Sequence, residues 1–259
     1  MRFHLSEWGW TEWDTRAFAR GWAIAALALG LVAVVTAASD EGSLAWGVRA
    51  GRTLPLAPVC SAVGAWLALA PARARGDDRA LAALGRSPFQ RELAAIAGGG
   101  AVALLAALAI AGSSRIDVAG FYPRAESSIH WRHDARGFVS DDDQWAVDAS
   151  GRPTLLVTAQ SADESGNGIP RRGRPAAALA TAALGVALPM LVARARSRRS
   201  MLLAAAAVGG GVLATVLAFQ AAAAALASPL AATAPPLLLL AVAASRYRAG
   251  AWFRARYPR

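Results

Sequence analysis

The sequence predicts an all-α polytopic membrane protein with six transmembrane helices and a small β-containing extracytoplasmic insert between helices three and four. Three observations predict this class. The 259-residue chain is 56% hydrophobic and only 17% charged, which is more apolar than an ordinary soluble domain. Six stretches are long and apolar enough to span a bilayer. Finally, the arginine-rich segments between these stretches all fall on one side of a six-helix arrangement.

The six candidate spans follow from hydropathy. A span needs about 20 mostly apolar residues, because only a helix satisfies its own backbone hydrogen bonds in hydrocarbon. The stretches cover residues 21–38, 53–72, 93–112, 176–193, 201–220 and 226–245. The last two are nearly continuous, and Gln220 followed by Ser228 and Pro229 predicts a tight hairpin near this junction, with a different break point as the alternative. We expect the first to be retained, because Glu7, Glu12 and Asp14 precede it; small residues at 36–38 leave a cleaved signal peptide as the alternative.

Charge predicts the orientation of these spans. Residues 73–92 hold five arginines against three acids, residues 194–199 hold four arginines, and the C-terminal tail from residue 246 holds five. Residues 113–175 instead carry eight arginines and nine acids. By the positive-inside rule the arginine-rich segments and both termini are cytoplasmic. The net charge of +10 therefore reports membrane topology, and we expect no nucleic-acid partner.

An aromatic cluster precedes and enters the first span. It contains Trp8, Trp10, Trp13, Phe18 and Trp22, interleaved with charged residues. Such a segment lies along a membrane interface, or packs at helical spacing against the bundle. The pattern leaves both alternatives open.

The proposed spans lack ionisable side chains well inside their apolar stretches. Proton-coupled transporters and intramembrane proteases usually need such groups at membrane depth, so we consider an intramembrane enzyme the least favoured class. Cys60 is the single cysteine, which excludes an internal disulfide. We expect no catalytic residue, metal site or cofactor. The glycine triplets at residues 98–100 and 209–211 predict close helix packing rather than hinges.

The chain divides into three parts. Residues 1–112 hold the N-terminal segment and the first three spans, residues 113–175 form the insert, and residues 176–259 hold the last three spans and a basic tail. The insert is too long for a simple connection and small for an independent domain. Short β-like runs at 128–131, 144–147 and 154–159, separated by turn formers, predict a small β-structured cap.

The loop after the second span predicts a short helix outside the bilayer. Asp77 and Asp78 favour a helix start, the alanines and leucines that follow are good helix formers, and Gly85 can end the helix. Leu81 and Leu84 are three residues apart and would share a face, forming a small apolar knob. A solvated turn is the alternative interpretation. The candidate docking residues are Asp77, Asp78, Ala80, Leu81, Leu84, Gly85, Ser87 and Pro88.

An acidic residue followed by Ala-Leu, Gly and Ser-Pro between helices two and three resembles the coupling helix of the lipopolysaccharide-export permeases, the LptF/LptG family of ABC transporters. The segment 230–239, with Pro235 and Pro236 before a leucine run, is similar to that family's Leu-Ala-Ala-Trp-x-Pro-Asn motif. Asp77, Thr233 and Pro236 replace the usual Glu, Trp and Asn. The six-span order also agrees, whereas residues 113–175 are too few for the family's full β-jelly-roll domain.

This resemblance implies a function. We expect a permease subunit, in the cytoplasmic (inner) membrane, that exports lipopolysaccharide or another lipid-linked envelope molecule. A separate cytoplasmic ABC ATPase would dock on residues 77–88, since this chain has no Walker motif. A second permease subunit, identical or related, would complete the transporter. The alternative is a non-transporting membrane scaffold or envelope assembly factor, which predicts no ATPase association.

Overall fold

The computed structural model describes residues 10–39, 44–122, 131–134, 137–140, 145–148, 151, 153–155 and 173–256. Within these residues, five helices are long and apolar enough to cross a membrane. They are α1 (Glu12–Ser39), the unit Trp46–Arg75, α5 (Pro88–Gly112), α7 (Gly173–Ala193) and α8 (Arg198–Ala223). The chain is therefore all-helical in its apolar part, as a multi-pass membrane protein requires.

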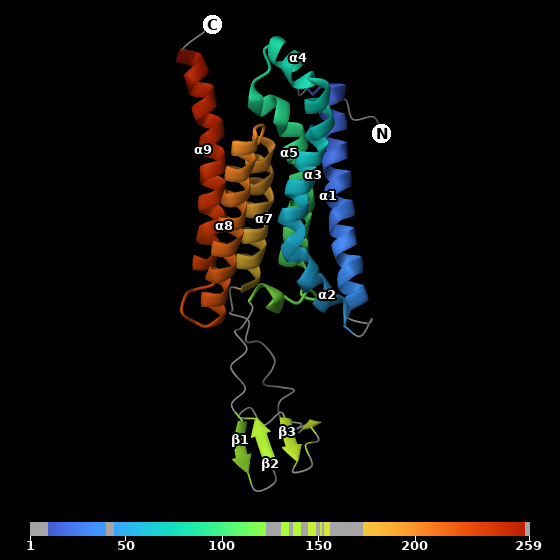
Figure 1. Ribbon diagram of the computed structural model, residues 1–259, viewed down its shortest axis with the longest axis vertical. Coiled ribbons are helices and arrows are strands. Elements are labelled where there is room, and N and C mark those ends of the chain that lie inside the picture. The colour runs from blue at the N-terminus through green and yellow to red at the C-terminus, as the bar shows by residue number, and fades with distance from the viewer. Residues whose placement is uncertain are drawn as a thin grey trace.

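The unit Trp46–Arg75 is interrupted near its start. It consists of α2 (Trp46–Thr53), the 3₁₀ turn η2 (Leu54–Leu56) and α3 (Ala57–Arg75). Pro55 occupies η2 and Pro58 the first turn of α3. Each proline lacks a backbone N–H, so the regular α-helical ladder is broken between α2 and α3. α2 consequently turns away from the axis of α3 at one end of the bundle (Figure 1).

The sixth predicted span differs from the structure. α8 continues to Ala223, and the chain then turns and passes through the 3₁₀ turn η4 (Ala231–Thr233) before α9 (Ala234–Arg256) begins. The proposed start at Leu226 is therefore wrong by eight positions. Because Arg246 and Arg248 fall within the helix, α9 is less apolar than the other long helices and is not among the five. It nevertheless runs alongside α7 and α8 (Figure 1).

The core is a bundle of α1, α3, α5 and α7, whose helices approach closely at glycines. A Cβ added to Gly64 on α3 would lie 2.5 Å from the carbonyl oxygen of Gly21 on α1. One added to Gly98 on α5 would lie 2.2 Å from the carbonyl oxygen of Phe18. Small residues thus allow backbone-to-backbone packing. The close packing predicted for residues 98–100 is present. In the second triplet only Gly211 packs closely, against the Leu239 side chain of α9, whereas Gly209 and Gly210 have open space around them.

The two ends of the bundle differ in charge. One end, the α4 end, carries α4 (Asp77–Ala83), the start of α1, the turn between α7 and α8, and the last turns of α9 (Figure 1). The opposite end, the α2 end, carries α2, the 3₁₀ turn η3 (Ala119–Phe121) and the turn between α8 and α9. The arginine-rich segments at 73–91 and 194–199 both belong to the α4 end.

The aromatic residues at the start of α1 pack on the bundle. Trp10, Trp13 and Phe18 lie against the buried cluster formed by α1, α3, α5, α7 and α9, and the rings of Trp10 and Phe18 are 6.1 Å apart. Packing is therefore the alternative that holds for these three residues. Trp22 is partly exposed, and Trp8 lies outside the described residues.

The insert contains a small antiparallel sheet of four strands in the order β1-β2-β3-β4. Its strands are β1 (Trp131–Asp134), β2 (Gly137–Ser140), β3 (Trp145–Asp148) and β4 (Pro153–Leu155). The β-like runs at 144–147 and 154–159 overlap β3 and β4, the run at 128–131 shares only Trp131 with β1, and β2 matches no predicted run.

Candidate functional site

α4 is a short helix set off by glycines from the long helices on either side. Gly76, with φ +78°, ends α3 and turns the chain into α4. At the other end Gly85, with φ +81°, donates its N–H to the carbonyl oxygen of Ala82, and Arg86 donates to that of Leu81. This pair of bonds is a Schellman motif, which requires a left-handed residue at the position of Gly85. The short helix expected from the sequence is thus present, in place of a simple turn.

The next helix starts at a well-formed cap. The side chain of Ser87 accepts a hydrogen bond from the backbone N–H of Gln90, and the Gln90 side chain accepts one from the N–H of Ser87. Pro88 occupies the first helical position, where its missing N–H costs nothing. Ser87 and Pro88 therefore fix the start of α5, which places the polar pair Arg91 and Glu92 one turn inside this helix.

Asp78 faces the bundle. Its carboxylate lies 3.0 Å from Nη1 of Arg91 on α5 and 2.7 Å from Nη1 of Arg196 in the turn between α7 and α8. Arg91 Nη1 also donates to the Asp78 backbone carbonyl oxygen at 2.7 Å. Arg91 is buried. One aspartate of α4 therefore joins this helix to α5 and to the α7–α8 turn through charge-assisted hydrogen bonds.

Glu92 extends these contacts into the core. Its side chain is 2% exposed, and its two oxygens bind different partners: Oε1 lies 2.9 Å from Nη2 of Arg196, and Oε2 accepts a 2.9 Å hydrogen bond from the Tyr247 hydroxyl on α9. The Arg194 guanidinium lies 4.4 Å from the centre of the Tyr247 ring, in a cation–π contact. A buried carboxylate is tolerated only with such partners.

We call Asp78, Arg91, Glu92, Arg196 and Tyr247 the ionic network. It connects α4 with α5, the α7–α8 turn and α9 through contacts that all lie at the α4 end. Removing one partner of a buried pair costs about 3–5 kcal/mol, because the other charge stays buried. Arg196 is 42% exposed, so solvent screens its contribution. Solvent therefore screens the network least at the buried Glu92 carboxylate and most at Arg196.

A second ion pair ties the start of α5 to α1. Arg86, in the turn after α4, places Nη1 2.8 Å from Oδ1 and Nη2 2.8 Å from Oδ2 of Asp14. This bidentate geometry is the strong form of an arginine–carboxylate pair. The neighbouring carboxylate raises the pKa of Arg86 above its ordinary value. Thr11 also donates to Asp14, through its N–H at 2.9 Å and its hydroxyl at 2.8 Å.

The eight candidate docking residues divide into an outer and an inner set. Ala80, Leu84 and Gly85 are exposed, and Leu84 is 79% exposed. The others are half-buried: Asp77, Asp78, Leu81, Ser87 and Pro88. Asp77 pairs with Arg75 at 2.8 Å. Leu84 therefore forms most of the predicted apolar knob, while Leu81 lies closer to the bundle and Asp78 anchors the helix from inside.

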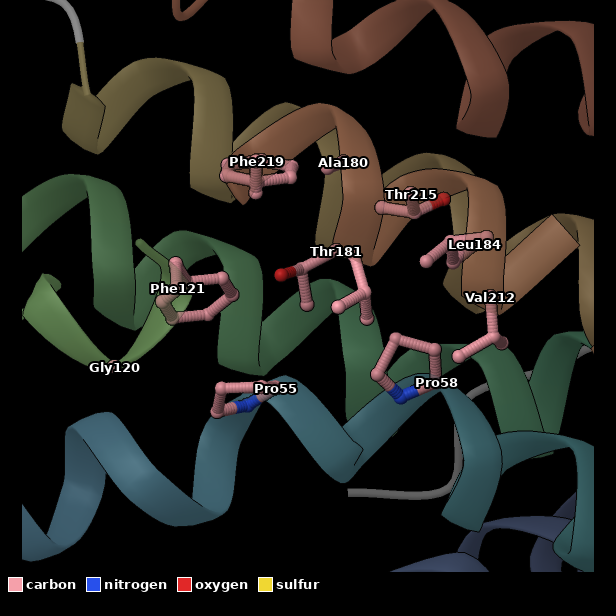
Figure 2. A pocket seen from close by; sticks show the side chains of 11 residues that line it. Pro55, Pro58, Gly120, Phe121, Ala180, Thr181, Leu184, Val212, Thr215 and Phe219 are labelled. Atoms are coloured by element: carbon pink, nitrogen blue, oxygen red, sulfur yellow. The ribbon is translucent and has the colours of Figure 1, made fainter. Parts of the chain in front are cut away.

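An apolar cavity lies nearer the α2 end, between η2, η3, α7 and α8 (Figure 2). Its volume is about 130 Å³, and its lining includes Pro58, Phe121, Leu184 and Phe219. Thr181 and Thr215 also line the cavity, but each hydroxyl donates to a carbonyl oxygen of its own helix, at 2.8 and 2.7 Å. The cavity thus offers apolar contacts for a few methylene groups, comparable in size to engineered cavities of about 150 Å³ that bind benzene.

Comparison of the chain with protein-family models, with curated proteins and with solved structures gives no match. Within the described part of the chain, no group of three or more His, Cys, Asp or Glu side chains is arranged to hold a metal ion.

Sequence reasoning did not find the inner half of this site. By sequence Arg91, Glu92 and Arg196 are charges of the loops between the predicted spans, and Tyr247 lies in the predicted basic tail that starts at residue 246. One signal was present in the sequence. Arg91 and Glu92 begin an otherwise apolar stretch, and charges at such a boundary need partners if they are buried. The partner of Arg91 is Asp78, 13 positions away, whereas the partners of Glu92 come from residues more than 100 positions away, which sequence spacing does not reveal.

Proposed function

We propose that this chain is the permease subunit of an ABC-type transporter, driven by a separate cytoplasmic ATPase that docks on α4. The observation that carries the proposal is that α4 combines an exposed apolar residue with a firm attachment to the bundle. Leu84, the C-cap residue directly after α4, is exposed to solvent, and Asp78 on the inner side of the helix binds α5 and the α7–α8 turn. A docking helix needs both an exposed contact and a firm attachment to the membrane helices.

The orientation follows from charge. The arginine-rich α4 end faces the cytoplasm by the positive-inside rule, and the insert lies on the outer side. In this proposal α9 is a sixth crossing. The start of α1 and the end of α9 lie at the same end of the bundle (Figure 1), and only an even number of crossings leaves both on one side of a membrane. The apolar part of α9 ends before Arg246 and is shorter than a full span, so η4 and the apolar turn before it then supply the rest of the apolar length. The membrane is the cytoplasmic (inner) membrane.

We propose that the contacts of α4 transmit force from a docked ATPase to the membrane helices. A displacement of α4 acts on Asp78 and, through Arg196, on Glu92 and Tyr247. Arg86 adds a parallel connection to α1 through Asp14. The ionic network and this pair attach α4 to both sides of the bundle, so nucleotide-driven closure of a docked ATPase would move several helices together. This coupling is our hypothesis for how the subunit works.

The substrate we propose is a lipid-linked envelope molecule, with lipopolysaccharide as the example that the LptF/LptG resemblance suggests. The apolar cavity suits an acyl segment better than an ion, since its hydroxyls are already bonded. A second permease subunit, identical or related, would complete the translocation path. Exposed leucines on α1 and α8, including Leu27, Leu31 and Leu213, leave apolar faces for lipid or for that subunit.

Co-expression with each ABC ATPase of the source genome tests the proposal. We expect one ATPase to copurify with the wild-type chain and to be lost with Leu84→Asp. Leu226→Asp is the matched control, because Leu226 is 83% exposed but lies at the α2 end. Absence of any copurifying ATPase, or equal retention by Leu84→Asp and the wild type, would contradict docking on α4. That result would favour the alternative, a membrane scaffold or envelope assembly factor.

A further inference from the structure

A large open groove lies beside α4, between the C-terminal part of α3 and the start of α8. Its volume is about 730 Å³. The lining comes from α3, from Asp78 and Arg79 of α4, from the α7–α8 turn at Ala195 and Arg196, and from Met201. The groove is distinct from the exposed knob at Leu84, which is not part of its lining.

The groove is rich in positive charge. Four arginines line it, Arg73, Arg75, Arg79 and Arg196, against the single carboxylate of Asp78. Arg75 pairs with Asp77, and Arg196 with Asp78 and Glu92. Arg79 forms no ion pair with any residue that the structure describes, and Arg73 is bonded only to the backbone carbonyl oxygen of Ala193. Neither guanidinium thus forms an ion pair with a carboxylate of the described chain, although Glu92 and Asp78 lie close enough to attract Arg73 electrostatically.

The surroundings of Arg73 also favour an anionic ligand. Its side chain is half-buried, and a partly desolvated cation is stabilised by an anion that can share its hydrogen-bond donors. The guanidinium presents several N–H groups, of which the Ala193 carbonyl uses one. Arginine binds phosphate oxygens in a bidentate fashion, which makes a phosphate group the matching anion.

The remaining lining is apolar and points to a lipid rather than a free anion. Trp66, Ala70 and Met201 line the part of the groove farther along α3 and α8 from α4. Trp side chains favour the level of lipid headgroups. The apolar cavity lies farther along the same two helices and is also lined by residues of both α3 and α8. A ligand with a phosphate and acyl chains therefore matches the order of groups along α3 and α8.

We infer that this groove binds the headgroup of an anionic phospholipid, with the phosphate on Arg73 and Arg79 and the acyl chains beside Trp66 and Met201. The lipid joins α3 and α4 to the start of α8, across the part of the site that the ionic network leaves open to solvent. The inference depends on the chain lying in a membrane, and not on ATPase docking.

Native mass spectrometry of the full chain tests this site. The protein is purified in detergent and exposed to phosphatidylglycerol or to phosphatidylcholine of the same chain length. We expect the wild type to retain phosphatidylglycerol, and the double variant Arg73→Gln/Arg79→Gln to bind it about tenfold more weakly, since two charge-assisted bonds are lost. Arg198→Gln/Arg199→Gln is the matched control, because these exposed arginines begin α8 but do not line the groove.

Three outcomes would overturn the inference. Equal retention of both lipids by the wild type would exclude selection of the anionic headgroup. Equal loss of phosphatidylglycerol in the two double variants would assign its binding to diffuse surface charge. Complete displacement of the lipid by an equal concentration of soluble glycerol phosphate would assign the groove to a free phosphate. Unchanged melting temperatures of both variants in lipid-free detergent check that the fold is preserved.

Discussion

The Arg196 guanidinium lies 2.9 Å from the carboxylate of Glu92, although the two residues are 104 positions apart in the chain. Glu92 is nearly fully buried on α5, and Arg196 reaches it from the turn between α7 and α8. The same guanidinium binds Asp78 on α4. This one side chain therefore connects the element that we propose for docking with the interior of the bundle.

Loss of Arg196 should destabilise the protein. In Arg196→Gln the buried Glu92 carboxylate keeps only Tyr247 as a hydrogen-bond partner among the described residues, and we expect a loss of about 1–3 kcal/mol in the free energy of unfolding, reduced from the buried-pair range by the exposure of Arg196. Thermal unfolding in detergent measures this change. The double variant Arg196→Gln/Glu92→Gln should recover part of the loss, whereas equal destabilisation of the double and single variants would show that the pair is not coupled.

The close helix contacts should be sensitive to a single methyl group. In Gly98→Ala the new Cβ would lie 2.2 Å from the carbonyl oxygen of Phe18, so α1 and α5 must separate. We expect a cost of about 1–3 kcal/mol, measured as a lower unfolding temperature. Gly209→Ala is the control, because nothing lies within 4 Å of its added Cβ and alanine favours the helix. Equal stability of the two variants would refute backbone-to-backbone packing at Gly98.

Tyr122 predicts a specific dependence on alkaline pH. Burial raises its pKa from 10.0 to about 12, and its hydroxyl donates to the carbonyl oxygen of Gly173 at 2.7 Å. The folded protein therefore keeps the phenol proton where the unfolded chain releases it, so this contribution to stability is complete below pH 10 and is lost as pH rises toward about 12.

The variant Tyr122→Phe isolates this effect. At pH 8 we expect it to be about 1 kcal/mol less stable than the wild type, because the hydrogen bond to Gly173 is absent. The difference should shrink between pH 10 and 12, where only the wild type loses the contribution of Tyr122. Unfolding temperatures of both proteins across this range provide the measurement. A constant difference at every pH would exclude Tyr122 as the titrating group.

Labelling of single cysteines tests the proposed orientation. Cys60 is buried and is replaced by alanine, after which Leu84→Cys and Leu226→Cys are made separately. In intact cells whose outer barrier is permeable, a membrane-impermeant maleimide should modify position 226 only. Position 84 should react after the cytoplasmic membrane is opened. Modification of position 84 in intact cells would place α4 on the outer face and remove the basis for ATPase docking.

Local sequence signals predicted the helices well. The apolar stretches matched five long helices, and the acidic pair before Ala80 with Gly85 after Leu84 predicted α4, because caps and left-handed glycines act within a few residues. The start of the last helix was wrong, because hydropathy does not distinguish the apolar turn at 226–230 from a helix, and Pro235 with Pro236 favours a start near Ala234.

The candidate site was only half predictable. The sequence predicts an apolar knob of Leu81 and Leu84; Leu84, the C-cap residue of α4, is exposed, whereas Leu81 is half-buried. The inward direction of Asp78 depends on Arg91 and Arg196, which the packing of α5 and α7 brings to it. Burial of Glu92 likewise depends on Tyr247 from the last helix. Such contacts are set by tertiary structure, and a single sequence without them shows only charges near the ends of apolar stretches.

Photocrosslinking from position 84 tests the docking claim most directly. A photoreactive amino acid replaces Leu84, or Leu226 as the control, in cells that contain the candidate ATPase. We expect irradiation to give a covalent adduct between the chain and the ATPase from position 84 and none from position 226. An ATPase adduct formed equally from both positions, or absent from position 84 although the ATPase copurifies with the chain, would contradict docking on α4.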